Sequence, residues 1–149
     1  MPSDRESHKS LGRLIASISR QAQVFIRKRA SKLGLGKGQF FLLKILATKE
    51  DLNQNELTGT LMIDKATTAR AIKSLESKGL AIRVVDPEDR RTNRLSLTPK
   101  GKKLCAELDE ISLELENRLL AGFSQKDRQC LSALLEKLVA NAEKVTESD

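Results

Sequence analysis

Tryptophan and tyrosine are absent from this sequence of 149 residues, and its only aromatic residues are four phenylalanines. Proteins that bind single-stranded nucleic acid stack bases on aromatic side chains, so the sequence disfavours that class of binder. There is one histidine, His8, and the two cysteines, Cys105 and Cys130, form no CxxC pair. A Cys/His zinc site needs more ligands than these, so we predict no bound metal and no cofactor.

Long apolar runs are also missing. No stretch resembles a signal peptide or reaches the roughly 18 apolar residues of a membrane-spanning helix. We therefore expect a cytoplasmic protein with free thiols and no membrane partner. Enzyme chemistry is a remote alternative, because no Ser/His/Asp set can be assembled. The glycine-rich stretch at 34–38 also lacks the strand and the GK[ST] ending of a phosphate-binding loop.

The net charge of +7 is unevenly distributed along the chain. Residues 1–63 and residues 64–103 each carry eleven basic and five acidic side chains, whereas residues 104–149 carry five basic and ten acidic ones. A basic region joined to an acidic end is typical of a protein that binds a polyanion through one part only. A generic solvated surface is the alternative, and the arginines between positions 83 and 94 favour the first interpretation.

The spacing of apolar residues predicts a mainly helical protein. A first helix starts at Lys9 with an apolar stripe at three- and four-residue steps, and it breaks in the glycine-containing stretch 33–38. The second helix, 39–48, is apolar nearly all round and should be the most buried. A long helix begins at Pro99 behind the cap Thr98. The last helix follows a cap formed by Ser124 and Asp127.

Two short helices occupy the centre of the chain. The first, 54–61, starts with Asn53 and Glu56 in the pattern of a capping box. A turn at residues 62–63 leads to Asp64, which caps the second helix, 65–78. The expected buried stripe of this second helix comprises Ala66, Ala69, Ile72 and Leu75.

A strand, a polar loop and a second strand follow this helix. Gly79 fits the position after a helix end, where a left-handed backbone conformation favours glycine. Residues 80–85 and 94–97 alternate and are predicted strands, joined by a loop at 86–93. We therefore expect a mainly α fold with one small β-hairpin.

Two helices joined by a tight turn are typical of a helix-turn-helix, whose second helix lies in the major groove of DNA. Small hydroxyl side chains allow close approach to base edges, and arginine binds guanine or phosphate. The candidate contacts on this helix are Lys65, Thr67, Thr68, Arg70 and Lys73. An ordinary solvated helix is the alternative, which Lys73 fits well.

The hairpin supplies a second candidate contact. Arg90 and Arg91 lie at its tip, where arginine is attracted to the minor groove of DNA. Acidic residues at 86, 88 and 89 oppose such a contact. We predict that one of the three, with Asp89 as the first choice, pairs with an arginine and directs it. A self-neutralised, solvated loop is the alternative that composition leaves open.

The run from Asp64 to Gly101 resembles the MarR family of winged helix-turn-helix transcription regulators. The residues that carry this resemblance are Asp64, Lys65, Thr67, Arg70, Leu75, Glu76, Gly79, Leu80, Arg83, Asp86, Asp89, Arg90, Arg91, Leu97, Thr98 and Gly101. The resemblance implies that helix 65–78 binds in the major groove and that the hairpin is a wing entering the minor groove. The predicted wing contacts are Asp89, Arg90, Arg91 and Asn93. Ala69 stands where the family often has threonine.

The outer helices have apolar stripes that the central unit is too small to cover. We predict that they interlock with a second copy of the chain, as the resemblance also implies. The prediction is one domain, 1–149, with support helices at 9–48, the winged unit at 53–97 and dimerisation helices at 98–146. Two recognition helices roughly 34 Å apart require a near-palindromic DNA target.

The resemblance further implies a small ligand, in this family commonly an aromatic acid, where the dimer helices meet the winged unit. Arg13 and Arg20 are either its carboxylate contacts or ordinary surface charges. Another branch of the family senses oxidants through a cysteine near the start of the first helix, but here both cysteines fit buried structural positions. We therefore disfavour a thiol switch.

The sequence thus predicts a homodimeric regulator that binds specific double-stranded DNA, a repressor released by a small ligand. The alternative is a winged-helix module for protein contacts or for nonspecific DNA packaging.

Overall fold

The computed structural model describes residues 10–36, 38–49, 51–61 and 63–147, which form helices with one small sheet. The elements are, in order, α1 (Leu11–Lys32), α2 (Gln39–Thr48), β1 (Leu52–Asn53), α3 (Gln54–Leu61), α4 (Lys65–Ser77), β2 (Ala81–Val85), β3 (Asn93–Leu97), α5 (Pro99–Leu119) and α6 (Gln125–Glu147). The chain divides into two compact units, Met1–Leu115 and Glu116–Asp149. The predicted helix start at Lys9 and the predicted turn residue Met62 lie outside the described residues. The predicted division into one domain with three segments stays a prediction.

The predicted starts of α3 and α5 are confirmed by their capping hydrogen bonds. At α3, the Glu56 N–H donates to Asn53 Oδ1 over 2.9 Å, and the Asn53 N–H donates to Glu56 Oε2 over 2.8 Å. The Thr98 hydroxyl accepts from the Gly101 N–H over 3.0 Å at α5. Such caps satisfy backbone donors that the first helical turn leaves without partners. These helix starts are therefore determined by nearby residues and can be predicted from the sequence.

The sheet has three antiparallel strands in the order β1–β3–β2, so the prediction of a two-stranded hairpin is incomplete. Leu52 pairs with Leu95 and Asn53 with Arg94, in a segment whose sequence indicates only a link between helices. Two residues are too short to show an alternating pattern, and the pairing partner lies more than forty positions away. The added strand holds the start of α3 beside the wing.

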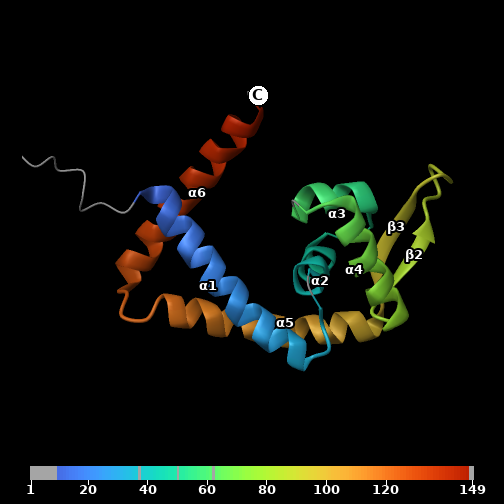
Figure 1. The fold of residues 1–149 in the computed structure, drawn as a ribbon, viewed down its shortest axis with the longest axis horizontal. Coiled ribbons are helices and arrows are strands. Elements are labelled where there is room, and N and C mark those ends of the chain that lie inside the picture. Colours follow the sequence, from blue (N-terminus) through green and yellow to red (C-terminus); the bar gives the residue numbers. More distant parts are fainter. Residues whose placement is uncertain (1–9, 37, 50, 62, 148–149) are drawn as a thin grey trace, which may run out of the picture. The chain divides into compact units, whose positions relative to one another are not determined.

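The core of the first unit is built around α2, as predicted. Leu42 and Leu43 are 0% exposed and Leu46 is 1% exposed. Around them pack residues of α3, α4, β3 and α5, namely Leu57, Ile72, Leu75, Leu95 and Leu108. Figure 1 shows α2, α3, α4 and the β2–β3 hairpin gathered over the N-terminal half of α5. The core therefore fixes α4 and the hairpin to one support.

Helices α1 and α5 are joined by a polar contact within the first unit. Arg29 donates from Nη2 to Glu114 Oε1 over 2.5 Å and lies over the Phe25 ring, 5.2 Å from its centroid. The outer face of α1 is apolar and exposed, and its large side chains Leu11, Leu14, Ile15 and Ile18 are 43–55% exposed. Over the described residues, no helix is long and apolar enough to cross a membrane.

The second unit contains the end of α5 and all of α6. Within α6 the described residues include none that is buried, and Leu134, Leu135 and Val139 are 46–59% exposed. A capping box starts this helix, because Ser124 Oγ accepts from the Asp127 N–H over 3.1 Å and Asp127 Oδ2 accepts from the Ser124 N–H over 3.0 Å. An amphipathic helix with an uncovered apolar face needs a partner to bury it.

Candidate nucleic-acid interface

The N-terminal end of α4 is organised by Asp64. Its carboxylate accepts from the Thr67 N–H over 2.8 Å and from the Thr67 hydroxyl over 2.6 Å. The hydroxyl of Thr67 lowers the pKa of Asp64 most, and the Thr67 backbone N–H lowers it further. Arg70 Nη2 in turn donates to Thr67 Oγ1 over 3.1 Å. Thr67 thus connects the cap to Arg70 and directs the guanidinium along the exposed face of the helix.

The outward face of α4 carries most of the candidate contacts predicted for it. Lys65, Arg70 and Lys73 are exposed, and Thr67 is half-buried. Between these side chains lie the exposed Ala66 and the half-buried Ala69. Two alanines between cations leave room for a close approach to the helix backbone.

The prediction that Thr68 contacts DNA is wrong. The sequence predicts an exposed DNA contact here, but the side chain is 0% exposed, and its hydroxyl donates to the Asp64 carbonyl over 3.1 Å. A side chain in this position cannot contact DNA. Positions 68, 72 and 75 recur at the spacing of one helix face. This periodicity predicts that Thr68 is buried, even though threonine is polar.

The predicted buried stripe of α4 is also partly wrong. Ala66 is exposed and Ala69 only half-buried, whereas Ala71 is 5% exposed and belongs to the core. Ile72 and Leu75 are buried as predicted. The correct stripe is therefore rotated away from the alanines that face outward.

One of the three acidic residues of the wing pairs with an arginine as predicted, but it is not Asp89, the first choice. Arg94 Nε donates to Asp86 Oδ2 over 2.6 Å, so Asp86, and not Asp89, pairs with an arginine side chain. The Glu88 N–H, which donates to Asp86 Oδ1 over 2.9 Å, lowers the pKa of Asp86 most, and Arg94 lowers it further. Asp86 is 7% exposed. One of the three acidic groups is thereby neutralised at the base of the loop.

Asp89 fixes the backbone of the wing tip instead. Its Oδ1 accepts from the Arg91 N–H over 3.0 Å, and its carbonyl accepts from both the N–H and the hydroxyl of Thr92 over 3.0 Å. These bonds form a local turn of the kind that aspartate favours. Arg90 and Arg91 are exposed on this turn. The aspartate therefore shapes the tip from which the arginines project.

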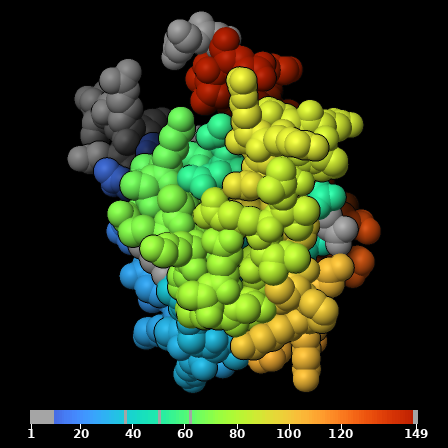
Figure 2. Space-filling view, turned by 90° about the vertical axis from the view of Figure 1, so that its right-hand side faces the viewer, coloured from blue at the N-terminus to red at the C-terminus, as the bar shows by residue number. Residues whose placement is uncertain are grey.

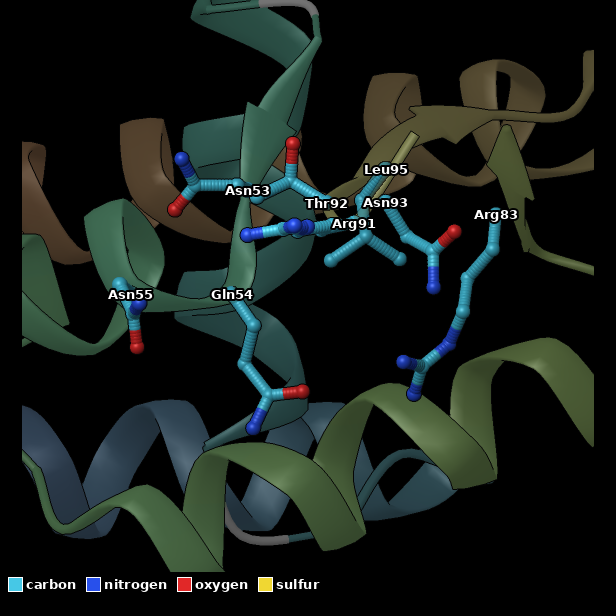
Figure 3. Close-up of a pocket in the computed structure, with 8 residues that line it drawn as sticks. All are labelled: Asn53, Gln54, Asn55, Arg83, Arg91, Thr92, Asn93 and Leu95. Carbon is cyan, nitrogen blue, oxygen red and sulfur yellow. The ribbon is translucent and has the colours of Figure 1, made fainter. Parts of the chain in front are cut away.

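A polar cavity of about 180 Å³ lies between the start of α3 and the hairpin. Its lining residues are Asn53, Gln54, Asn55, Arg83, Arg91, Thr92, Asn93 and Leu95. In Figure 3 the Arg91 side chain extends over the start of α3, while Gln54 and Arg83 extend toward α4. The cavity brings the predicted Arg91 and Asn93 together with amide side chains that the sequence indicates only as part of a helix start.

Arg83 connects the two halves of the candidate interface. Its Nε donates to both carboxylate oxygens of Glu76 over 2.9 and 3.1 Å, which joins β2 to α4. Figure 2 shows α4 and the hairpin on one face of the molecule. Lys65, Arg70, Lys73, Arg90 and Arg91 are all exposed on these two elements. Such a basic surface with amide donors suits a polyanion with regularly spaced phosphates.

The cysteines do not form a reactive site with these residues. Cys105 is buried, and its thiol lies 3.7 Å from the Leu43 carbonyl. Burial raises the pKa of the Cys105 thiol, and the nearby Asp109 raises it further. Cys130 is exposed, so the prediction of a buried position is wrong for this cysteine. Among the described residues, no group of three or more His, Cys, Asp or Glu side chains could hold a metal ion.

Comparison with known proteins matches residues 35–92 to the model of the MarR family. A MarR transcriptional regulator from Methanosarcina mazei Go1 is 37% identical, with a TM-score of 0.85 over 91% of this chain and 97% of its own. The HTH-type transcriptional regulator YwoH of Bacillus subtilis (strain 168) is 32% identical over 81% of this chain and 90% of its own length. A MarR-family protein from Listeria monocytogenes, solved with a 26mer DNA, is 30% identical, with a TM-score of 0.80 over 90% of this chain and 89% of its own.

Proposed function

Because this chain belongs to the MarR family of transcriptional regulators, we propose that it is a homodimeric repressor that binds specific double-stranded DNA. The observation that carries the proposal is the basic face formed by α4 and the wing tip. On that face Lys65, Arg70 and Lys73 of α4 are exposed together with Arg90 and Arg91 of the wing. A regulator of this kind acts on the chromosome, so the proposal includes a cytoplasmic location.

Helix α4 enters the major groove in this proposal. The exposed Ala66 and the half-buried Ala69 allow the helix backbone to approach the base edges closely. Arg70, held by Thr67, reaches guanine O6 and N7 or a phosphate. Lys65 and Lys73 flank it as phosphate contacts, which contribute affinity without sequence information.

The wing arginines enter the adjacent minor groove, and the cavity beside them holds a backbone phosphate. Support for this assignment comes from Arg91 and Asn93, which line the cavity together with Gln54 and Asn55 at the first turn of α3. Amides and guanidinium groups are common donors to phosphate oxygens. Arg83 is neutralised by Glu76, so we assign it to support of the wing rather than to DNA contact.

A second copy of the chain covers the apolar faces of α1 and α6. These faces are supported as interfaces by Leu11, Leu14 and Ile18 on α1 and by Leu135 and Val139 on α6, each 43% exposed or more. A twofold dimer presents two copies of α4 roughly 34 Å apart, one turn of the double helix. The target is therefore a near-palindrome whose half-sites are separated by about one helical turn.

Release of the DNA by a small ligand completes the proposal. The resemblance to the family supports an aromatic acid bound where the dimer helices meet the winged unit. Ligand and DNA then oppose each other through one coupling free energy that acts equally in both directions. Arg13 and Arg20 are exposed on α1, which suits either a carboxylate contact or a surface charge.

The experiment that tests the proposal is selection of bound sequences from random duplex DNA, followed by titration at fixed salt. A regulator should prefer the selected palindrome over random duplex by about 10³-fold or more. Equal affinity for all duplexes, with binding governed by salt alone, would instead identify a nonspecific packaging protein. Repeating the titration with a panel of aromatic carboxylates tests ligand release. A repressor of the proposed kind requires loss of DNA affinity on addition of at least one of them.

A further inference from the structure

The C-terminal end of α4 is bonded to parts of the chain far away in sequence. Lys78, the residue that follows the last turn of α4, donates from Nζ to the Gly34 carbonyl over 2.5 Å. The same ammonium donates to Gln39 Oε1 over 2.8 Å. Gly34 lies in the connection between α1 and α2, and Gln39 is the first residue of α2. One side chain therefore joins the recognition helix to the end of α1.

The two acceptors are themselves held in place. The Gly34 N–H donates to the Ser31 carbonyl over 3.1 Å, and the Leu35 N–H donates to the Ala30 carbonyl over 3.0 Å, which closes the end of α1. Gln39 is 6% exposed, and its Oε1 also accepts from the Gly36 N–H over 3.0 Å. The ammonium thus bonds one acceptor fixed by the end of α1 and one buried at the start of α2. Hydrogen bonds from a charged donor such as this ammonium are stronger than those between neutral groups.

Helix α5 holds the same end of α4 from another direction. Lys100 Nζ donates to the Lys78 carbonyl over 3.0 Å, and the Thr98 hydroxyl donates to the Gly79 carbonyl over 2.6 Å. The Thr98 N–H donates to the Leu80 carbonyl over 3.1 Å. The end of α4 is therefore connected to both helices that lead away from the winged unit.

The opposite end of α4 has contacts of a different kind. The side-chain hydrogen bonds of Asp64, Thr67, Thr68 and Arg70 join residues only three or four positions apart. With 13 residues, α4 is about 20 Å long at a rise of roughly 1.5 Å per residue. The core holds α4 to the rest of the winged unit, so a pivot of that unit by about 10° about Lys78 would move the DNA-facing end of α4 by about 3.5 Å, which is close to the rise of one base pair.

We propose that Lys78 is a positioning residue that sets the angle of α4 against α1, and thereby the half-site spacing that the protein accepts. The inference rests on the proposed function, because a spacing exists only for a dimer on a near-palindromic target. Movement of α1 is transmitted through Gly34, and through Gln39 at the start of α2, to Lys78 and then to the DNA-facing end of α4. Lys78 itself contacts no DNA in this proposal.

The test uses the full-length protein and the selected palindrome, with the half-sites moved together or apart by one or two base pairs. The measured quantity is the ratio of affinities for the best spacing and for the altered spacings at fixed salt. Lys78→Met keeps the aliphatic stem and removes the donors, and it should lower this ratio at least about threefold. Lys78→Arg keeps a cation and should retain most of it. Gln39→Met removes one acceptor and should lower the ratio in the same direction.

The matched control is Lys103→Met, which removes the same charge from an exposed position on α5. It should lower the affinity for every spacing equally and leave the ratio unchanged. If Lys78→Met also left the ratio unchanged, Lys78 would act only as a charge or as a support of the fold, and the inference would be overturned. A double variant of Lys78 and Gln39 that lost far more discrimination than Lys78→Met alone would also overturn it, because the two residues would then act separately.

Failure of the proposed function is distinguishable from failure of this inference. Wild-type protein that bound no palindrome would contradict the function itself. Wild-type protein that bound the palindrome and tolerated every spacing would contradict only the role of Lys78. Thermal unfolding of each variant, measured alongside, identifies a variant that has lost its fold, and Gln39→Met then carries the test.

Discussion

Replacement of Gly101 by alanine should destabilise the protein, although alanine normally favours a helix. A Cβ atom at position 101 would lie 2.1 Å from the Leu80 carbonyl oxygen and 3.3 Å from Leu97 Cδ2, whereas real Cβ atoms essentially never approach closer than 3.0 Å. The obstacle is backbone and not the end of a flexible side chain. Relief therefore requires α5 to move by about 1 Å away from the end of α4.

The size of the effect follows from what this movement would break. Thr98 bonds the carbonyls of both Leu80 and Gly79, and loss of these two hydrogen bonds costs about 1 kcal/mol each. Residual overpacking adds about 1–3 kcal/mol. The higher helix propensity of alanine relative to glycine offsets about 1 kcal/mol of this lost stability. The net loss is about 2–4 kcal/mol of unfolding free energy, which lowers the unfolding midpoint by about 5–15 °C for a chain of this size.

Thermal unfolding followed by circular dichroism measures this shift, with all variants at equal protein concentration because association changes the midpoint. The matched control is Gly59→Ala in α3, where an added Cβ has no neighbour within 4 Å. That variant should be more stable than wild type by about 0.5–1 kcal/mol. If Gly101→Ala were as stable as Gly59→Ala, the close approach of α5 to the end of α4 would be refuted.

Three further variants test the wing tip and the start of α4. Arg91→Ala should lower the affinity for DNA and reduce the slope of log K against log salt by about 0.9 for each phosphate that the arginine neutralises. Light scattering should show an unchanged oligomeric state. An unaltered salt slope would show that Arg91 is not part of the interface. Thr68→Leu should lower the unfolding midpoint, because overpacking a filled site costs about 1–3 kcal/mol, and a change in sequence preference without destabilisation would contradict the buried position. Asp64 has a folded pKa below its ordinary value of 3.8, so its charged form stabilises the fold above that pH, and the effect is lost as the pH falls through the folded pKa. Asp64→Asn should therefore unfold at a lower temperature than wild type at pH 7, and a difference that persisted undiminished at a pH below the folded pKa would contradict the cap.

Local features were predictable from the sequence because their causes lie within a few residues. The box of Asn53 and Glu56 and the cap Thr98 each bond a residue three positions away. Asp89 shows the limit of such reasoning. Its acidic side chain beside arginines suggests an ion pair, but a backbone N–H two positions away is a nearer partner. The ion pair forms instead between Asp86, just after β2, and Arg94 of β3, which is paired with Val84 in the strand register.

Two neighbouring threonines at the start of α4 show that the position of a residue on the helix, rather than its residue type, decides whether it is buried. Thr67 and Thr68 have the same side chain and adjacent positions, yet one bonds Arg70 at the surface and the other is 0% exposed. Periodicity separates them, since Thr68 lies one turn before Ile72 on the buried face. Residue type alone does not distinguish them, and a prediction that follows residue type assigns both to DNA.

The two ends of α4 differ in what a sequence can reveal, and the difference bears on specificity. The end that we propose to face DNA is capped and oriented by Asp64 and Thr67, so its side-chain geometry is encoded locally. The other end depends on Lys78 bonding acceptors 39 and 44 positions away, which no local pattern indicates. Relatives that share the residues of the first end can therefore contact similar bases and still require different half-site spacings. If Lys78 sets the angle of α4, substitutions at positions 34, 39 and 78 should alter spacing preference while base preference within each half-site stays the same.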